Sequence, residues 1–217
     1  MDVKLLGAQA RKIFECFMSD VLFMVSAQSV QQLREKTGVG MMECKKALEE
    51  AGGDMNKAIE ILRKSGMAKA VKKSERSTDQ GIVEAYIHGG GRVGVLLKLL
   101  CETDFVAKND TFKQLAHDLS LHIAGMRPMY VSMDDIPEDI KESERRIYRE
   151  QFAGSGKPPE VIEKIVEGKL KSFGAELALI EQPFVKDQDK RVGDVINDYI
   201  AKLGENIKVG GFVRYEI

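Results

Sequence analysis

The stretch Val95-Leu-Leu-Lys-Leu-Leu-Cys-Glu-Thr-Asp-Phe-Val-Ala-Lys-Asn109 joins a short apolar run to a polar motif. The run from Val95 to Leu100 predicts a β-strand, and a helix that Asp110 can cap is expected to follow. Phe105 therefore stands at a strand-to-helix junction. A large aromatic side chain there is either a core plug or an exposed anchor for a partner.

A second strand is predicted just before this stretch. Between residues 82 and 88, Ile82, Glu84, Tyr86 and His88 alternate with Val83, Ala85 and Ile87. Gly89, Gly91 and Gly94 then match the dinucleotide-binding pattern G-x-G-x-x-G. That pattern needs a helix after the glycines, and a strand follows here, so we interpret the glycines as a hairpin turn.

The rest of the core region predicts helices and one more strand. The helix after the motif carries an apolar face of Phe112, Leu115, Ala116, Leu119 and Ile123. Further helices are expected at Pro137–Phe152, Pro159–Ile180 and Val192–Leu203, and a closing strand at Phe212–Glu216. The predicted fold class is α+β, with a core domain of a small antiparallel sheet packed with helices over residues 81–217.

Residues 26–66 predict a separate module of three short helices. The apolar spacings i, i+3, i+4 and i+7 recur here, and the breaks fall at Gly38-Val39-Gly40, at Gly52-Gly53 and at Gly66. Asp54 is expected to cap the third helix. Residues 67–80 are polar and basic, and we interpret them as a solvated linker helix rather than a nucleic-acid contact.

The composition favours a protein of the reducing cytoplasm. The 217 residues carry 33 basic and 34 acidic side chains, a balance that gives no general field for nucleic acid or an acidic membrane. Cys16, Cys44 and Cys101 form no C-x-x-C pair. His117 and His122 are interpreted as solvated or core-edge residues, because no further ligand has metal-binding spacing.

No catalytic constellation is predicted. The sequence has no nucleophile with a paired base and no phosphate-binding loop of the G-x-x-x-x-G-K-[ST] type. We therefore expect no enzyme activity, no cofactor, no metal and no direct nucleotide binding.

Residues 1–25 are interpreted as an N-terminal extension. Their apolar run is interrupted by Glu15 and Asp20, which disfavours a membrane span, a secretory signal and a mitochondrial presequence. Our hypothesis is that Met24 is the true start. The alternative is an extra amphipathic helix that packs on the body.

The motif T-D-F-V-A-K-N at residues 103–109 resembles the signature of the elongation factor Ts family. The string L-R-E-K-T-G-V-G-M-M-E-C-K-K-A-L at residues 33–48 resembles the ubiquitin-associated-like domain that opens this family, and the resemblance extends in order over residues 26–217. It implies a guanine-nucleotide exchange factor for the GTPase elongation factor Tu. M-V-S-A-Q-S-V, from Met24, is similar to the family's usual opening.

The resemblance also implies which residues contact the GTPase. The implied partner-binding residues are Asp104 and Phe105 at the tip, Thr103 and Val106 in the same motif, and Arg34, Met41 and Met42 in the first module. We interpret Phe105 as the anchor, Val106 as a core contact and Thr103 as a local cap. A core role for one of the two methionines is about equally consistent with the sequence.

Two further expectations and one alternative function remain. The short form of the family implies a homodimer. Gly210-Gly211 replace the basic residues of many relatives, and glycine here predicts a bulge. The alternative function is an adaptor whose three-helix module binds a ubiquitin-like or ribosome-associated partner.

Overall fold

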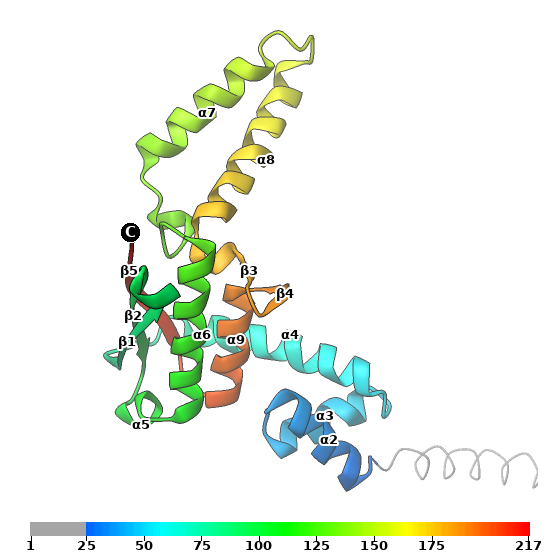
Figure 1. Ribbon diagram of the computed structural model, residues 1–217. Helices are drawn as coiled ribbons and strands as arrows, with labels where there is room; N and C mark the ends of the chain where they lie inside the picture. The colour runs from blue at the N-terminus through cyan, green and yellow to red at the C-terminus, as the bar shows by residue number, and fades with distance from the viewer. Residues whose placement is uncertain (1–24) are drawn as a thin grey trace, which may run out of the picture. The chain divides into compact units, whose positions relative to one another are not determined.

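The computed structural model describes residues 25–217 (Figure 1). The expectations about Met24 and the N-terminal extension therefore lie outside the described residues, apart from Val25. The chain divides into two compact units, with the boundary between Lys69 and Ala70.

The first unit is built from three helices, α2 (Ala27–Thr37), α3 (Met41–Glu50) and α4 (Met55–Lys73), the last of which continues into the second unit. Ser26 caps α2, and Gly38 ends it with a φ of 68°, a conformation that suits glycine. Asp54 accepts hydrogen bonds from the N–H groups of Asn56 and Lys57, as a helix cap does. The core consists of Val30, Leu33, Cys44, Ala47, Leu48, Ala58 and Leu62.

The third helix does not stop at Gly66. It runs on to Lys73, so the prediction of a break there is wrong. A glycine in a helix interior costs about 0.5–1 kcal/mol, and the continuing helix offsets this by packing. Gly66 itself is buried, and Ala70 belongs to the core of the second unit. The expected linker is therefore helical over its first half and not solvated throughout.

The second unit contains a three-stranded antiparallel sheet in the order β1-β2-β5, formed by β1 (Gln80–His88), β2 (Val93–Cys101) and β5 (Ile207–Glu216). Gly89–Gly91 connect β1 to β2, which confirms the hairpin in place of a dinucleotide loop. The closing strand is longer than predicted, since it begins at Ile207. The fold class is α+β, as predicted.

The predicted bulge lies at Gly210. Lys98 pairs with Gly211 while Leu99 pairs with Val209, so Gly210 is the extra residue on β5. A Cβ atom at Gly210 would lie 2.9 Å from Leu100 Cδ1 and 3.1 Å from Lys98 Cδ. Gly211 has a φ of 139°, which side chains rarely tolerate. The close contacts at Gly210 and the positive φ of Gly211 therefore explain why the strand has glycine at both positions.

Helices α6 (Asp110–Met126) and α9 (Val192–Leu203) pack against the sheet (Figure 1). Their apolar faces form one core with the inward side chains Val95, Leu97 and Leu99 of β2. The cap of α6 is Asn109, whose side chain accepts the Thr111 N–H at 2.8 Å. The expectation that Asp110 caps this helix is wrong by one residue, because Asp110 is already its first helical residue.

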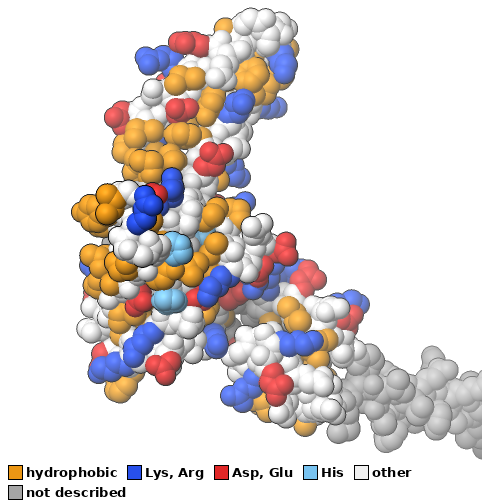
Figure 2. Space-filling model, in the orientation of Figure 1, with side chains coloured by type: hydrophobic (Ala, Val, Ile, Leu, Met, Phe, Trp, Pro, Cys, Tyr) orange, Lys and Arg blue, Asp and Glu red, His pale blue; other side chains and the backbone are white. Residues whose placement is uncertain are grey.

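Helices α7 (Glu138–Phe152) and α8 (Pro159–Leu177) form a hairpin that extends away from the sheet (Figure 1). Acidic and basic side chains are scattered among hydrophobic ones over its surface (Figure 2). Arg149 joins the two helices by donating to both carboxylate oxygens of Glu163, at 2.9 and 3.1 Å. The short strands β3 (Pro183–Phe184) and β4 (Asp187–Arg191) follow, and the sequence did not predict them.

His122 is fully buried, so its interpretation as a solvated or core-edge residue is wrong. Its Nδ1 accepts the Val185 N–H at 3.1 Å, and its Nε2 lies 2.9 Å from Gln182 Oε1. Gln182 in turn donates to the carbonyl of Glu176 at 2.6 Å. These partners satisfy both nitrogens of a neutral imidazole. Helix periodicity alone did not predict this role for His122. His117 is partly exposed and lies 3.3 Å from Glu84.

Candidate partner-binding site

The signature motif forms a single helical turn, α5 (Asp104–Ala107), directly after β2. Thr103 adopts an extended conformation before it, and its Oγ1 accepts the Val106 N–H at 3.4 Å. This is the N-cap arrangement that ends a strand and starts a helix. The predicted role of Thr103 as a local cap is confirmed.

The turn places its side chains on two sides. Phe105 is 82% exposed, whereas Val106 packs against the core and Ala107 is buried. Successive residues of a helix point about 100° apart, so the core contacts of Val106 and Ala107 direct Phe105 outward. The core-plug alternative for Phe105 is wrong, and Val106 is the core contact.

Asp104 lies beside Phe105 and is paired in the free protein. Lys108 Nζ lies 2.7 Å from Asp104 Oδ2, across one helical turn. The hydrogen bond from Lys108 is the main reason that the pKa of Asp104 is lowered from its ordinary value. Asp104 is therefore ionised at neutral pH and presents a negative charge next to an exposed aromatic ring.

The base of the turn is held by residues about 100 positions later in the chain. Glu205 Oε2 accepts the Thr103 N–H at 3.0 Å, and Glu205 Oε1 accepts the Thr103 hydroxyl at 2.6 Å. The Asn206 N–H donates to Glu102 Oε1 at 2.6 Å. Sequence reasoning missed these residues, because no local spacing links the loop after α9 to the end of β2.

The other predicted contact residues lie in the first unit, around the turn between α2 and α3. Arg34 is exposed in the last turn of α2. Met41 and Met42 are the first residues of α3, and they are 44% and 66% exposed. The alternative that one methionine belongs to the core is therefore wrong. Gly40 precedes them, and nothing lies within 4 Å of the position a Cβ would take there.

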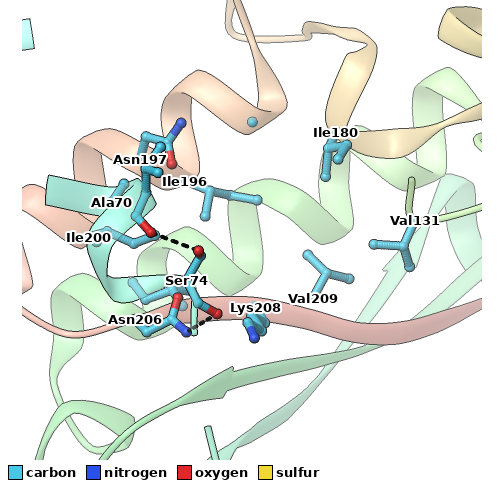
Figure 3. Close-up of a pocket in the computed structure, with 13 residues that line it drawn as sticks. Ala70, Ser74, Val131, Ile180, Ile196, Asn197, Ile200, Asn206, Lys208 and Val209 are labelled. Atoms are coloured by element: carbon cyan, nitrogen blue, oxygen red, sulfur yellow. Dashed lines mark hydrogen bonds between the residues drawn. The ribbon is translucent and has the colours of Figure 1, made fainter. Parts of the chain in front are cut away.

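A mostly apolar groove of about 400 Å³ lies between α9, the outer edge of β5 and the residues around the end of α4 (Figure 3). Ile180 and Val131 lie toward one end, and Asn206 lies near Ser74 at the other.

Across residues 25–217, no group of three or more His, Cys, Asp or Glu side chains is arranged to hold a metal ion. Within the same range, no helix is long and apolar enough to cross a membrane.

Fold and site together define a class: a small α+β protein with a helical first unit and a sheet-and-helix second unit that displays an acidic–aromatic turn. A sequence model of the family described as Elongation factor TS matches residues 9–217. The chain belongs to the elongation factor Ts family.

Individual relatives are similar over most of their length. Elongation factor Ts of Carboxydothermus hydrogenoformans is 55% identical over 194 residues, which cover 89% of this chain and 89% of that protein. Elongation factor Ts of Moorella thermoacetica is 54% identical over 194 residues, 89% of this chain and 96% of the relative. The protein of the same name from Fervidobacterium nodosum is 55% identical over 193 residues, 89% and 98% of the two chains.

Proposed function

We propose that this chain is a guanine-nucleotide exchange factor of translation elongation in the cytoplasm. It binds elongation factor Tu in its GDP-bound state and promotes GDP release, so that GTP can bind again. It performs no covalent chemistry of its own. Family membership supports this proposal, and the observation that carries it is the exposed Phe105 on a capped turn.

Phe105 supplies the apolar part of the contact. A phenylalanine that is 82% exposed leaves most of its ring available for burial in a partner. Transfer of such a ring into an apolar crevice of the GTPase contributes about 1.5–3 kcal/mol. The short turn needs no rearrangement for this contact, because the ring already lies outside the core.

Asp104 supplies the electrostatic part. A GTPase holds GDP through backbone N–H groups around the phosphates and through Mg²⁺. A carboxylate brought near that region competes for the same donors and cation and disfavours the bound anion. The ion pair of Asp104 with Lys108 lies on the surface, where such pairs contribute little stability and exchange partners readily.

Exchange follows from differential binding. A factor that prefers the nucleotide-free GTPase lowers the GTPase's affinity for nucleotide by the same coupling free energy, because linkage is reciprocal. A coupling of about 4 kcal/mol corresponds to about a thousandfold in affinity. Phe105 can supply a large part of this energy, and the remainder must come from Asp104 and a second contact.

The second contact is proposed on the first unit, at Arg34, Met41 and Met42. Both methionine side chains are exposed, and flexible thioether chains adapt to a partner's surface. Arg34 adds a charged, multidentate donor on the other side of the same turn. The division into a ubiquitin-associated-like domain, a linker and an exchange domain is part of this proposal.

Stopped-flow fluorescence tests the proposal directly. Elongation factor Tu loaded with a fluorescent GDP analogue is mixed with excess unlabelled GDP, with and without micromolar amounts of this protein. The proposal predicts a large increase in the GDP dissociation rate. An unchanged rate across the full concentration range would reject it.

The adaptor function makes a different prediction for variants of the two units, measured as partner binding and as GDP release. If the first unit alone binds the partner, replacing Met41 and Met42 by alanine abolishes all binding and Phe105→Ala has no effect. Under the exchange proposal, Phe105→Ala abolishes most of the acceleration, whereas the double methionine variant weakens binding and leaves measurable exchange. Nothing in the structure favours the adaptor over the exchange factor.

We also propose a homodimer that buries the open face of the sheet. Val83, Ile87, Leu96, Val213 and Tyr215 are 47–74% exposed and lie on the side of the sheet away from α6 and α9. Leu96 pairs with Ala85 on one neighbour strand and Val213 on the other, so the apolar row crosses all three strands. Hydrophobic side chains gather over this part of the molecule (Figure 2). Two such faces can pack about 10 Å apart as a sandwich around a two-fold axis.

A further inference from the structure

The loop after α9 forms two hydrogen bonds to Thr103 in the candidate site. Glu205 uses one carboxylate oxygen for the Thr103 N–H, at 3.0 Å, and the other for its hydroxyl, at 2.6 Å. The same hydroxyl oxygen accepts the Val106 N–H. Glu205 thus orients the group that caps α5, and Asp104 and Phe105 follow directly from that cap.

The loop itself is well anchored. Gly204 ends α9 with a φ of 81° and its carbonyl accepts Lys73 Nζ. Asn206 is almost fully buried, and its amide donates to the carbonyl of Arg76 at 2.9 Å. It also donates to the carbonyl of Ser74 at 3.4 Å (Figure 3). Its N–H binds Glu102 Oε1. Glu205 is therefore held between two fixed neighbours.

The turn needs this support because it has little stability of its own. Helix α5 is four residues long, and a helix of one turn does not form independently in water. Phe105 gains little packing in the free protein, since 82% of it is exposed. What keeps the ring in one direction is the cap at Thr103 together with the core contacts of Val106 and Ala107.

We infer that Glu205 is a positioning residue of the exchange factor, which fixes the Asp104–Phe105 turn in the conformation that enters the GTPase. This inference rests on the proposed exchange function. A preorganised turn binds without an ordering cost, whereas a frayed turn must be ordered by the partner. Loss of Glu205 lowers exchange through the orientation of Phe105 and leaves the fold in place.

The main test compares Glu205→Ala with Glu205→Gln and with the control Glu84→Ala. Glu84 is also a partly buried glutamate with a side-chain partner, His117, and it lies in β1 rather than in this network. We expect Glu205→Ala to lower the maximal rate of stimulated GDP release about tenfold or more. Glu205→Gln restores part of the rate, since its amide can still accept the Thr103 N–H. Glu84→Ala stays within about twofold of the unmodified protein.

A double variant distinguishes the proposed positioning role of Glu205 from a purely structural role. If Glu205 acts by fixing the Asp104–Phe105 turn, then Glu205→Ala lowers exchange much less in the Phe105→Ala background than it does alone, because only the contribution of Asp104 is left to lose. The inference is overturned if the two losses multiply, or if Glu205→Ala alone exchanges at the unmodified rate. In the latter case, the proposed exchange function still stands.

A second measurement does not depend on the GTPase. Amide hydrogen exchange of the free protein reports the order of the turn residue by residue. Glu205→Ala should speed exchange at the Thr103 and Val106 amides by about tenfold or more while Leu115 in α6 stays protected. If the unmodified protein fails to release GDP, the proposed function falls, and this measurement alone decides whether Glu205 orders the turn. Unchanged protection at Val106 would refute the inference.

Discussion

Lys108 lies one helical turn after Asp104, and its Nζ is 2.7 Å from the Asp104 carboxylate, so the residue next to the exposed Phe105 carries a surface ion pair. The pair keeps the acid ionised and holds it in a defined place until a partner arrives. A surface ion pair is a weak restraint, so the carboxylate can change partners on binding.

Lys108→Ala should therefore leave exchange largely intact. The variant removes a competitor for Asp104, and we expect the stimulated rate of GDP release to stay within about threefold of the unmodified protein. Asp104→Asn keeps the shape and removes the charge, and it should lower the rate clearly. The same stopped-flow assay measures both. Loss of exchange in Lys108→Ala, comparable to that in Asp104→Asn, would mean that the pair itself contacts the GTPase.

Alanine variants of two phenylalanines, one exposed and one buried, distinguish an effect on exchange activity from an effect on folding stability. Phe105→Ala should change the free energy of unfolding by less than about 0.5 kcal/mol, because surface substitutions seldom do more. It should still abolish most of the exchange activity. Phe112→Ala, at a fully buried position in the first turn of α6, should cost about 3–5 kcal/mol. Urea denaturation and GDP release, measured on both variants, give the comparison. A large loss of stability in Phe105→Ala would contradict the exposed turn.

The open sheet face predicts the oligomeric state. Val213→Glu places a charge at the β5 end of the apolar row and should convert a dimer to a monomer, because an unpaired charge is costly to bury. Val161→Glu, on a similarly exposed valine of α8, is the matched control and should not change the mass. Sedimentation equilibrium over a range of protein concentrations measures both. A monomer in the unmodified protein would reject the dimer.

His122 predicts how stability depends on pH. Burial lowers the pKa of this imidazole, against a smaller opposing effect of the Gln182 hydrogen bond. Nδ1 of the neutral ring accepts the Val185 N–H. Protonation would put a hydrogen on Nδ1, so that two N–H groups would face each other and this hydrogen bond would be lost. The unfolded chain takes up the proton near pH 6.5, before the folded protein does. The contribution of His122 to stability is thus fully present above about pH 6.5 and is lost as the pH falls through the lower folded pKa.

Urea unfolding at several pH values between about 5 and 8 checks this prediction, with His122→Gln and His88→Gln as a pair. His122→Gln should be less stable at neutral pH and should lose this part of the pH dependence. His88→Gln keeps the buried imidazole and should retain it. Equal slopes in the two variants would show that another group is responsible.

The sequence predicted the elements well where the pattern was local. The alternation in residues 82–88, the glycine turn and the apolar spacing of α6 gave the hairpin and its covering helix, because side-chain direction in strands and helices follows a fixed period. The errors came where a distant contact overrides a local signal. Gly66 stays helical because the helix packs on both sides of it, and His122 is buried because Gln182 and Val185 supply its partners.

The candidate site divides in the same way. Thr103 as a cap and Val106 as a core contact could be inferred from residue type and order in the motif. The exposure of Phe105 could not be decided by composition, since aromatic side chains are usually buried, and the family resemblance was needed to favour it. Glu205 and Asn206 gave no local signal, because they approach the motif only when β5 pairs with β2.

By itself, the sequence determined the period of the longer helices and of the β1–β2 hairpin, several of the caps and turns that limit them, and the family to which the chain belongs. These features depend on neighbours within a few residues, which the linear order of the chain already contains. The tertiary structure decided which side of α5 faces water, which sheet face stays uncovered and which glutamate supports the turn. Each of these depends on contacts between residues that are far apart in the chain, and they exist only once the core has packed.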